Sequence, residues 1–191
     1  SGDEGLIAAF NSGEDIHTST AAEVFGVDKA SVTREQRSAA KAVNFGIVYG
    51  ISDYGLAKNI GVSRKEAGEF IRRYLEKYCG VQEYMHRCVE EGRKKGYVTT
   101  LMGRRRELPE IKSSNFNTRS FGERVAMNMP IQGTAADIIK MAMVNVHKRL
   151  EEEGLKARLI LQIHDELIID TPFDEEQRVR KLLAECMQNV M

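Results

Sequence analysis

The stretch 34-REQRSAAKAVNFGIVYG-50 constrains the fold most, because two cations and then two aromatics recur along it at intervals of four. These residues are Arg37, Lys41, Phe45 and Tyr49. A helix turns about 100° per residue, so each step of four drifts by only about 40° and the side chains form one slowly winding stripe. Good helix formers dominate residues 34–43, and Thr33 is a candidate N-cap, so the sequence predicts a helix here.

Two interpretations of this stripe remain open from its residues. Aromatics four apart on a helix are usually core residues, and this reading covers Phe45 or Tyr49 taken singly. It covers the two cations less well, because Arg and Lys are almost never fully buried unless they are paired. A ligand with an anionic tail and a flat head would use all four side chains, and a nucleoside triphosphate has both parts.

The bulk composition is that of a folded domain. The chain has 191 residues and 42% hydrophobic residues, enough for one large domain or parts of two. It shows no secretory signal and no apolar run long enough to cross a membrane, so no membrane partner is expected. The three cysteines, Cys79, Cys88 and Cys186, match no zinc spacing and are interpreted as reduced thiols of a cytosolic protein.

Charge is unevenly distributed although the net charge is zero. Residues 29–124 hold 20 Lys and Arg against 11 Asp and Glu, whereas the rest of the chain holds 8 against 17. A basic middle with acidic flanks favours a polyanionic partner for one region only. The run 93-RKK-95 fits a solvated helix face. The run Arg104, Arg105 and Arg106 follows a strand-like segment and Gly103, and three adjacent arginines at a turn repel one another unless something anionic lies nearby.

Caps, periodicity and breakers predict the remaining elements, with Ser63 and Glu66 as a capping box at the start of one helix. Helices are expected over 15–26, 63–80, 81–95, 134–153 and 174–190, and strands over 97–102, 157–163 and 167–171. A polar loop is expected from the end of the first strand through Asn117. Pro130 and Gly133 are interpreted as breaks, so we place a boundary near residue 133 between a helical basic part and a sheet-containing acidic part.

A second cluster of charged residues, 164-HDE-166, lies between two strongly apolar strands. An ordinary polar hairpin tip is one interpretation, but two-residue hairpins normally use Asn-Gly or Asp-Gly, and no glycine is present. Adjacent carboxylates on a rigid hairpin suit Mg²⁺, which takes one or two protein carboxylates and fills its other positions with water and phosphate. His164 is a weaker candidate zinc ligand, because no second His or Cys lies nearby in sequence.

The stripe and the carboxylate hairpin together suggest metal-assisted nucleotidyl or phosphoryl transfer. A Gly-rich phosphate loop of the G-x-x-x-x-G-K-[ST] type is absent from the sequence. The run from Arg37 to Gly50 resembles motif B of family A DNA polymerases, the bacterial DNA polymerase I group, and 162-QIHDE-166 resembles motif C. The segments 97-YVTTLMGRRRELP-109 and 124-RVAMNMPIQGTAAD-137 are also similar to that family.

The resemblance implies a mixed, helix-rich α/β fold, with a helical fingers subdomain over 1–132 and part of an antiparallel-sheet palm over 133–191. It implies that Arg37 and Lys41 hold the incoming triphosphate, that Phe45 stacks on the nucleotide, and that Tyr49 lies where the templating base enters. His17 would add a phosphate contact. The residues implied to contact template and primer are Arg124, Asn128, Gln132 and His164, with Arg104, Arg105 and Arg106 as basic DNA contacts. Asp165 would bind catalytic Mg²⁺ and Glu166 would support that site, and both are candidate catalytic residues together with Lys41.

The chain begins at 1-SGDEGLIAAF-10, so the family's motif A, with its other metal-binding aspartate, and the thumb would lie elsewhere in a longer enzyme. Two-metal catalysis needs carboxylates from both motifs. We therefore expect the isolated 191 residues not to extend a primer. Two functions stay open: a fragment of a template-directed DNA polymerase that uses primer–template DNA and deoxynucleoside triphosphates, or a non-catalytic nucleic-acid and nucleotide-binding module. A bacterial cytoplasmic, nucleoid-associated location is expected.

Overall fold

The computed structural model describes residues 1–191, and it is built mainly of helices with two small two-stranded sheets. The mixed, helix-rich α/β class expected from the sequence is confirmed. The α-helices are α1 (Glu4–Asn11), α2 (Ile16–Phe25), α3 (Arg34–Val48), α4 (Asp53–Ile60), α5 (Arg64–Lys77), α6 (Cys79–Lys95), α7 (Phe116–Glu152) and α8 (Glu176–Gln188). The strands are β1 (Tyr97–Thr99), β2 (Arg105–Glu107), β3 (Arg158–Ile163) and β4 (Glu166–Asp170), and short 3-10 helices lie at Lys29–Ser31, Pro109–Lys112 and Phe173–Glu175.

The chain folds as two compact units. The first contains Ser1–Val98 and Arg105–Asn128, and the second contains Thr99–Arg104 and Met129–Met191. The expected boundary near residue 133 lies a few residues beyond this division. No sequence pattern predicted that the tip of the β1–β2 ribbon, residues 99–104, belongs to the second unit.

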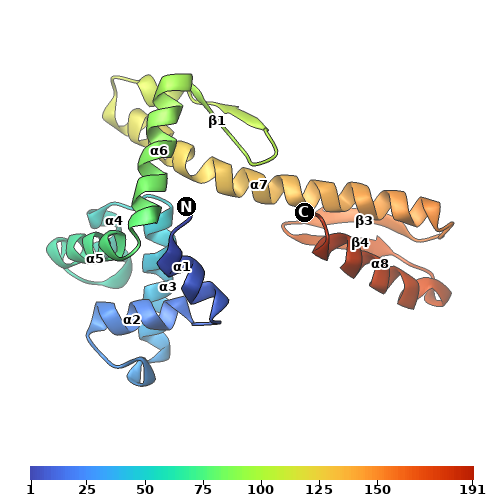
Figure 1. Ribbon diagram of the computed structural model, residues 1–191, viewed down its shortest axis with the longest axis horizontal. Helices are drawn as coiled ribbons and strands as arrows, with labels where there is room; N and C mark the ends of the chain where they lie inside the picture. The colour runs from blue at the N-terminus through green and yellow to red at the C-terminus, as the bar shows by residue number, and fades with distance from the viewer. The chain divides into compact units, whose positions relative to one another are not determined.

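In the first unit, α3 packs its buried face against α4, α5 and the start of α6 (Figure 1). Val43 and Ile47 of α3 are almost fully buried there, together with Leu56 of α4 and Ala67 of α5. Local sequence fixes where these helices start. Thr33 and Ser63 each form a capping box, with Gln36 and Glu66 three residues on. The capping residues predicted from the sequence are therefore confirmed.

The long helix α7 is the main correction to the expected elements. The sequence predicted a polar loop through Asn117 and a helix beginning near Thr134, whereas α7 runs unbroken from Phe116 to Glu152 with Pro130 inside it. Proline removes one helical hydrogen bond, so packing must hold both sides of it. On the N-terminal side Gly122 meets the turn after β2 so closely that an added Cβ would lie 2.7 Å from the Ile111 nitrogen.

On the C-terminal side of Pro130, the Thr134 hydroxyl accepts a hydrogen bond from the Leu101 backbone N–H, 3.0 Å away, and donates to the Pro130 carbonyl oxygen. Thr134 is itself buried. Tertiary contacts thus keep the helix continuous through a residue that breaks most helices, because most helical stability in proteins comes from packing rather than from propensity.

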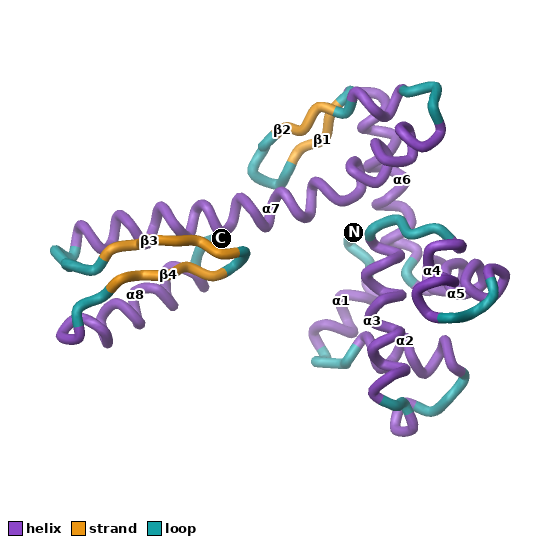
Figure 2. The backbone as a smooth tube through the Cα atoms, turned by 180° about the vertical axis from the view of Figure 1, so that it is seen from behind, coloured by secondary structure: helices purple, strands orange, loops and turns teal.

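In the second unit, the β3–β4 hairpin packs one face on α7 and α8 (Figures 1 and 2). The shared core contains Val146 and Leu150 of α7, Leu167 of β4 and Leu182 of α8. The strands are antiparallel, and Ile163 pairs with Glu166, so only His164 and Asp165 form the turn. The opposite face of the hairpin leaves apolar side chains exposed, among them Ile160, Leu161 and Ile168.

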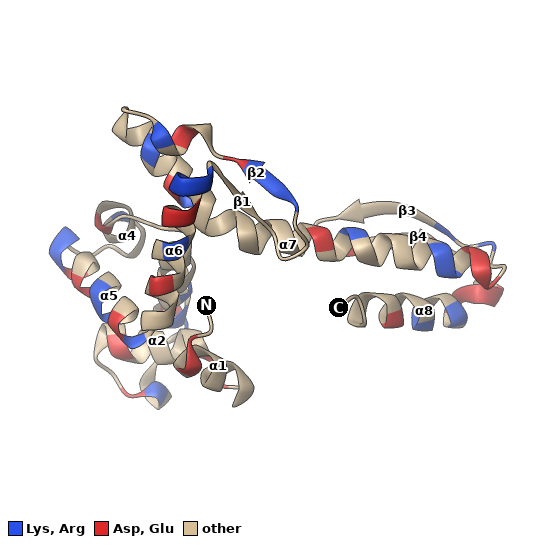
Figure 3. Cartoon of the chain, turned by 45° about the horizontal axis from the view of Figure 1, so that its top comes forward, with Lys and Arg blue, Asp and Glu red and all other residues tan.

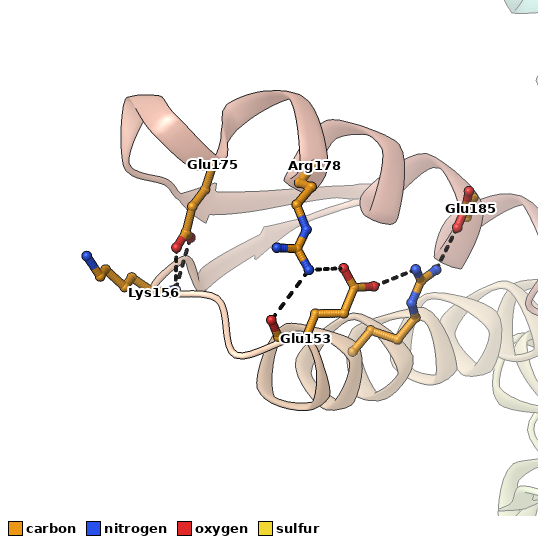
Figure 4. Close-up of polar contacts among 6 residues, drawn as sticks. Glu153, Lys156, Glu175, Arg178 and Glu185 are labelled. Atoms are coloured by element: carbon orange, nitrogen blue, oxygen red, sulfur yellow. Dashed lines mark hydrogen bonds and ion pairs between the residues drawn. The ribbon is translucent and has the colours of Figure 1, made fainter.

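Ion pairs tie the far end of this unit together (Figure 4). Arg149 of α7 bridges Glu153 and Glu185 at 2.7 Å each, and Arg178 of α8 also reaches Glu153. The Glu175 carboxylate accepts hydrogen bonds from the backbone N–H groups of Lys156 and Ala157. These contacts join α7, α8 and the start of β3 at the end of the hairpin opposite its turn.

All three cysteines are free thiols, in agreement with the sequence interpretation. None of the helices, including the 37-residue α7, is apolar enough over a sufficient length to span a membrane.

Candidate functional site

The stripe on α3 exists as predicted, and its aromatics are not core residues. Phe45 and Tyr49 are 47% and 43% exposed, which rules out the interpretation that they simply fill the interior. Their ring centroids lie 6.3 Å apart with the planes inclined by 17°, and Lys41 Nζ lies 5.8 Å from the Phe45 centroid. The buried face of the same helix carries Val43 and Ile47, so packing orients the stripe outward.

The two cations of the stripe differ in their partners. Arg37 Nε lies 2.6 Å from a carboxylate oxygen of Asp15, the N-cap of α2. The guanidinium holds the pKa of Asp15 well below its ordinary value, and the carboxylate raises the pKa of Arg37. Lys41 makes no ion pair within the chain. One cation is therefore partly neutralised and the other is free to meet an anion.

His17 of α2 lies beside the stripe, although 28 residues separate it from Phe45. Its ring centroid is 5.9 Å from that of Phe45, and its Nδ1 is 2.9 Å from Nδ2 of the buried Asn44. Burial lowers the pKa of His17 below its ordinary value, with Asp15 opposing the shift and the nearby cations supporting it. The structure thus places His17 beside the stripe, and its phosphate contact stays a prediction.

Arg124 of α7 lies at the C-terminal end of the stripe. Gly50 follows Tyr49 with a left-handed φ of 73°, and a Cβ there would lie 3.2 Å from Arg124 Cγ and 2.7 Å from Met127 Cε. Glycine is therefore required both by the backbone and by this close approach. Arg124 is exposed and forms no ion pair within the chain.

The two other α7 residues implied to contact DNA have different surroundings. Asn128 closes the first unit, and its Oδ1 is buried without a hydrogen-bond partner. Gln132 is exposed in the second unit. The stripe, His17, Arg124 and Asn128 thus belong to one compact unit, and Gln132 to the other.

The hairpin residues His164, Asp165 and Glu166 are all exposed at the tip of the β3–β4 hairpin. His164 has a φ of 52°, the left-handed conformation that non-glycine residues rarely adopt. The Gln162 side-chain amide donates a hydrogen bond to the His164 carbonyl oxygen and so holds this turn. The expected hairpin is confirmed, with histidine at a position that usually takes glycine.

Asp165 and Glu166 suit a hard divalent cation by their donor chemistry. Both are carboxylates on a supported hairpin, and neither forms an ion pair within the chain. Nowhere in the chain do three or more His, Cys, Asp or Glu side chains gather as a potential metal site. By themselves the two carboxylates therefore supply only part of a Mg²⁺ site, in which water and substrate phosphate would fill other positions.

Basic residues colour strand β2 blue in Figure 3. Each of the three consecutive arginines, Arg104, Arg105 and Arg106, has a carboxylate partner within the chain. Arg104 Nε lies 2.5 Å from Asp137, which is buried and also accepts a hydrogen bond from Thr100. Arg105 pairs with Glu107 at 2.7 Å, and its guanidinium lies 3.6 Å from the Tyr97 ring centroid. Arg106 lies 3.9 Å from Glu110. The negative charge expected near these three adjacent arginines is thus supplied in part by carboxylates of the chain itself.

Sequence reasoning missed Asp15 and Asn44 as part of this site. Asp15 lies at the start of a predicted helix, where an acidic residue is ordinary, but a side chain that caps one helix can also reach a neighbouring one. Asn44 carries a usable signal, since asparagine is a poor helix former inside an otherwise strong helix and is buried there among apolar residues.

Comparison with known proteins matches the whole chain to one family. The family model for DNA polymerase family A matches residues 1–191. DNA polymerase I of Bacillus subtilis is 59% identical over 99% of this chain, and that of Geobacillus stearothermophilus is 58% identical over 99%. The chain spans 22% of the length of each of these relatives.

A solved structure agrees with this match. The POL domain of Pol1 from M. smegmatis, in complex with DNA primer-template and dNTP, superposes with a TM-score of 0.88 at 44% identity, over 99% of this chain and 33% of that one. Because the family model matches every residue and the stripe and hairpin both lie within the match, the chain belongs to DNA polymerase family A.

Proposed function

We propose that these residues are the fingers and part of the palm of a bacterial DNA polymerase I, which transfers a nucleotidyl group from a deoxynucleoside triphosphate to a primer 3′-hydroxyl. The observation that carries this proposal is the exposed stripe on α3, where an unpaired Lys41 precedes two stacked, solvent-facing aromatic rings. Exposed aromatic surface next to a free cation matches a ligand with a flat base and an anionic tail.

In this role Lys41 and Arg37 bind the triphosphate, His17 donates to it, and Phe45 and Tyr49 meet the flat part of the ligand and the next template base. Arg37 must exchange its Asp15 partner for phosphate or share it between the two. A doubly or triply charged phosphate competes well with one exposed carboxylate, because charge-assisted hydrogen bonds to phosphate are strong.

Asp165 and Glu166 would hold Mg²⁺, which supplies Lewis-acid stabilisation of the charge on the reacting phosphate when it is bound. The chain's own part is to hold these two carboxylates outward on a hairpin whose other end is fixed by the core of α7 and α8. Since two carboxylates make an incomplete set for two metals, the remaining ligands would come from other segments of the polymerase.

DNA is the proposed macromolecular partner. The structural neighbour was solved with DNA primer-template and dNTP. The side chains proposed to contact DNA are Arg124, Asn128, Gln132, His164, Arg105 and Arg106, with Arg104 limited by its bond to Asp137. Partners of this kind and the bacterial relatives also favour a cytoplasmic location.

A test of the nucleotide site uses Lys41→Ala in a polymerase I that carries these 191 residues. Losing one hydrogen bond to a charged partner is expected to lower kcat/KM about ten- to a hundredfold for all four deoxynucleotides alike. Lys58→Ala, a charge-matched change at an exposed α4 position away from the stripe, is the control. Equal effects of the two substitutions would contradict the assignment.

The second candidate, a binding module without chemistry, makes a different prediction in the same protein. It requires that Asp165→Asn leave primer extension unchanged, because a binding module has no use for a metal-binding carboxylate. The exposed, unpaired Asp165 on its supported turn favours the catalytic reading.

A further inference from the structure

Asn44 is an unusual residue in α3, because it is polar and only 6% exposed on a face that otherwise packs apolar side chains. A buried amide is stable only when its hydrogen bonds are made. Asn44 makes two of them with residues of α2, on opposite ends of its amide. The Thr20 hydroxyl donates to Oδ1 at 2.9 Å, and Nδ2 lies 2.9 Å from His17 Nδ1.

In the structure the amide of Asn44 has its oxygen toward Thr20 and its nitrogen toward His17. Thr20 is 5% exposed, and its hydroxyl places a donor against the oxygen end of Asn44. The amide nitrogen, which can only donate, faces His17 Nδ1. An imidazole nitrogen that accepts a hydrogen bond carries no proton, so the proton of the neutral ring must be on Nε2.

The surroundings of His17 make this tautomer consequential. Asp15, Arg37 and Lys41 are the charged groups that act on the ring, and burial favours its neutral form. Nε2 is on the far side of the ring from Asn44 and makes no hydrogen bond within the chain. With a proton, it is a donor for a phosphate oxygen. Without one, its lone pair would repel that oxygen.

We propose that Asn44 is a positioning residue that fixes the Nε2–H tautomer of His17, so that the ring offers a donor to the triphosphate bound along the α3 stripe. This inference rests on the proposed function for the phosphate, whereas the tautomer itself belongs to the free chain.

The first experiment measures the tautomer in the free 191-residue chain, labelled with nitrogen-15 in histidine. Spectra are recorded at pH about 8, above the ordinary histidine pKa of about 6.5, and His17→Gln assigns the signals. Wild type should show His17 with a protonated Nε2 and an unprotonated Nδ1. A His17 ring protonated on Nδ1, or divided between the two forms, would overturn the proposal.

Two variants then test whether Asn44 is the cause. Asn44→Asp puts an acceptor opposite Nδ1 and, at pH about 8, should move the single proton of the neutral ring from Nε2 to Nδ1. Thr20→Val keeps the size of the side chain and the amide of Asn44 but frees its orientation, so both tautomers should appear. His147, exposed on α7 in the other unit, should keep its signals in both variants. A His17 tautomer unchanged in both variants would show that Asn44 does not set it.

The second experiment titrates inorganic triphosphate into wild type, Thr20→Val, Asn44→Asp and Lys41→Ala. Losing the Nε2–H donor should weaken binding about tenfold in Asn44→Asp, and less in Thr20→Val, which adds no charge. If Lys41→Ala weakens binding while neither α2–α3 variant does, the nucleotide site stands and the role of Asn44 is overturned. If none of the variants changes binding, the proposed nucleotide site itself fails.

Discussion

The α3 stripe and the β3–β4 hairpin place charged side chains in two different ways. On the stripe, charged and polar groups are paired within the unit: Arg37 binds Asp15, and Asn44 contacts both His17 and Thr20. At the hairpin tip, Asp165 and Glu166 form no ion pair and rely only on the rigid apolar strands behind them. The first region is organised before any ligand binds, and the second is organised in backbone but not in its side-chain contacts.

This difference teaches what each region requires from outside the chain. A site whose cations and imidazole are already oriented loses little conformational entropy on binding an anion. Two neighbouring carboxylates repel each other until a cation joins them, so the hairpin gains most from a metal ion. The comparison predicts that substitutions at the hairpin act on the chemical step and substitutions on the stripe act on nucleotide affinity.

The largest expected effect separates those two roles in a polymerase I that carries this chain. Asp165→Asn should lower kcat by at least about a hundredfold, because a metal ion stabilises developing phosphate charge strongly. Nucleotide affinity in the binary complex should change little. Asp170→Asn, at the other end of the same hairpin, is the matched control. Single-turnover extension measures the rate of the chemical step, and nucleotide titration measures affinity. If Asp165→Asn lowers only nucleotide affinity, the hairpin and the stripe do not have the different roles proposed.

The next effect tests whether the two units are stabilised by separate cores. Leu182 and Leu56 are fully buried in the second and first unit respectively. Each Leu→Ala change should lower the free energy of unfolding of its own unit by about 2–5 kcal/mol. Amide hydrogen exchange should show lost protection in β3, β4 and α8 for Leu182→Ala, and in α3, α4 and α5 for Leu56→Ala. Equal losses in both units would mean that they unfold as one body.

A smaller effect concerns the acid sensitivity of the second unit. The hydrogen bond from Thr100 and the ion pair with Arg104 hold the pKa of Asp137 below its ordinary value. A carboxyl of this kind stabilises the fold above about pH 4, where it is ionised in the unfolded chain, and loses that contribution as the pH falls through its lower folded-state pKa. Asp137→Asn should therefore lower stability near neutral pH and make it depend less on pH below about 4.

Urea unfolding of the second unit at pH values from about 7 down to about 3 measures this dependence. Asp174→Asn, at an exposed carboxyl in the short helix before α8, serves as the control and should leave the acid limb unchanged. If the unfolding free energy of Asp137→Asn and of wild type falls equally with pH below about 4, other carboxyls dominate the acid sensitivity.

The smallest effect probes the start of α3. Thr33 accepts a hydrogen bond from the Gln36 backbone N–H, and the Gln36 side chain accepts one from the Thr33 N–H. Thr33→Ala should cost about 1 kcal/mol in the unfolding free energy of the first unit and nothing in the second. Ser38→Ala, at an exposed position inside α3, controls for loss of a hydroxyl that is not a helix cap. Chemical denaturation, monitored by one spectroscopic probe in each unit, measures the unfolding free energy of the first and of the second unit separately.

The sequence by itself determined the local features of this protein. The four-residue spacing predicted the α3 stripe, Thr33 and Ser63 predicted two helix starts, and the apolar runs around 164-HDE-166 predicted the hairpin. Each depends on residues within about a dozen positions of one another, where spacing translates directly into a helical face or a strand pair. The two motifs also sufficed to indicate the family.

Only the tertiary structure decided the rest. Pro130 is accommodated inside α7 because Gly122 packs against Ile111 and Thr134 binds Leu101. These partners come from other segments of the chain, so no local sequence pattern reveals them. Arg104 binds Asp137, which is 33 residues away in the sequence, and His17 contacts Asn44, which is 27 residues away. Spacing can show which face of a helix a side chain occupies, but the partner that fixes its charge or its tautomer comes from another element and is decided by packing.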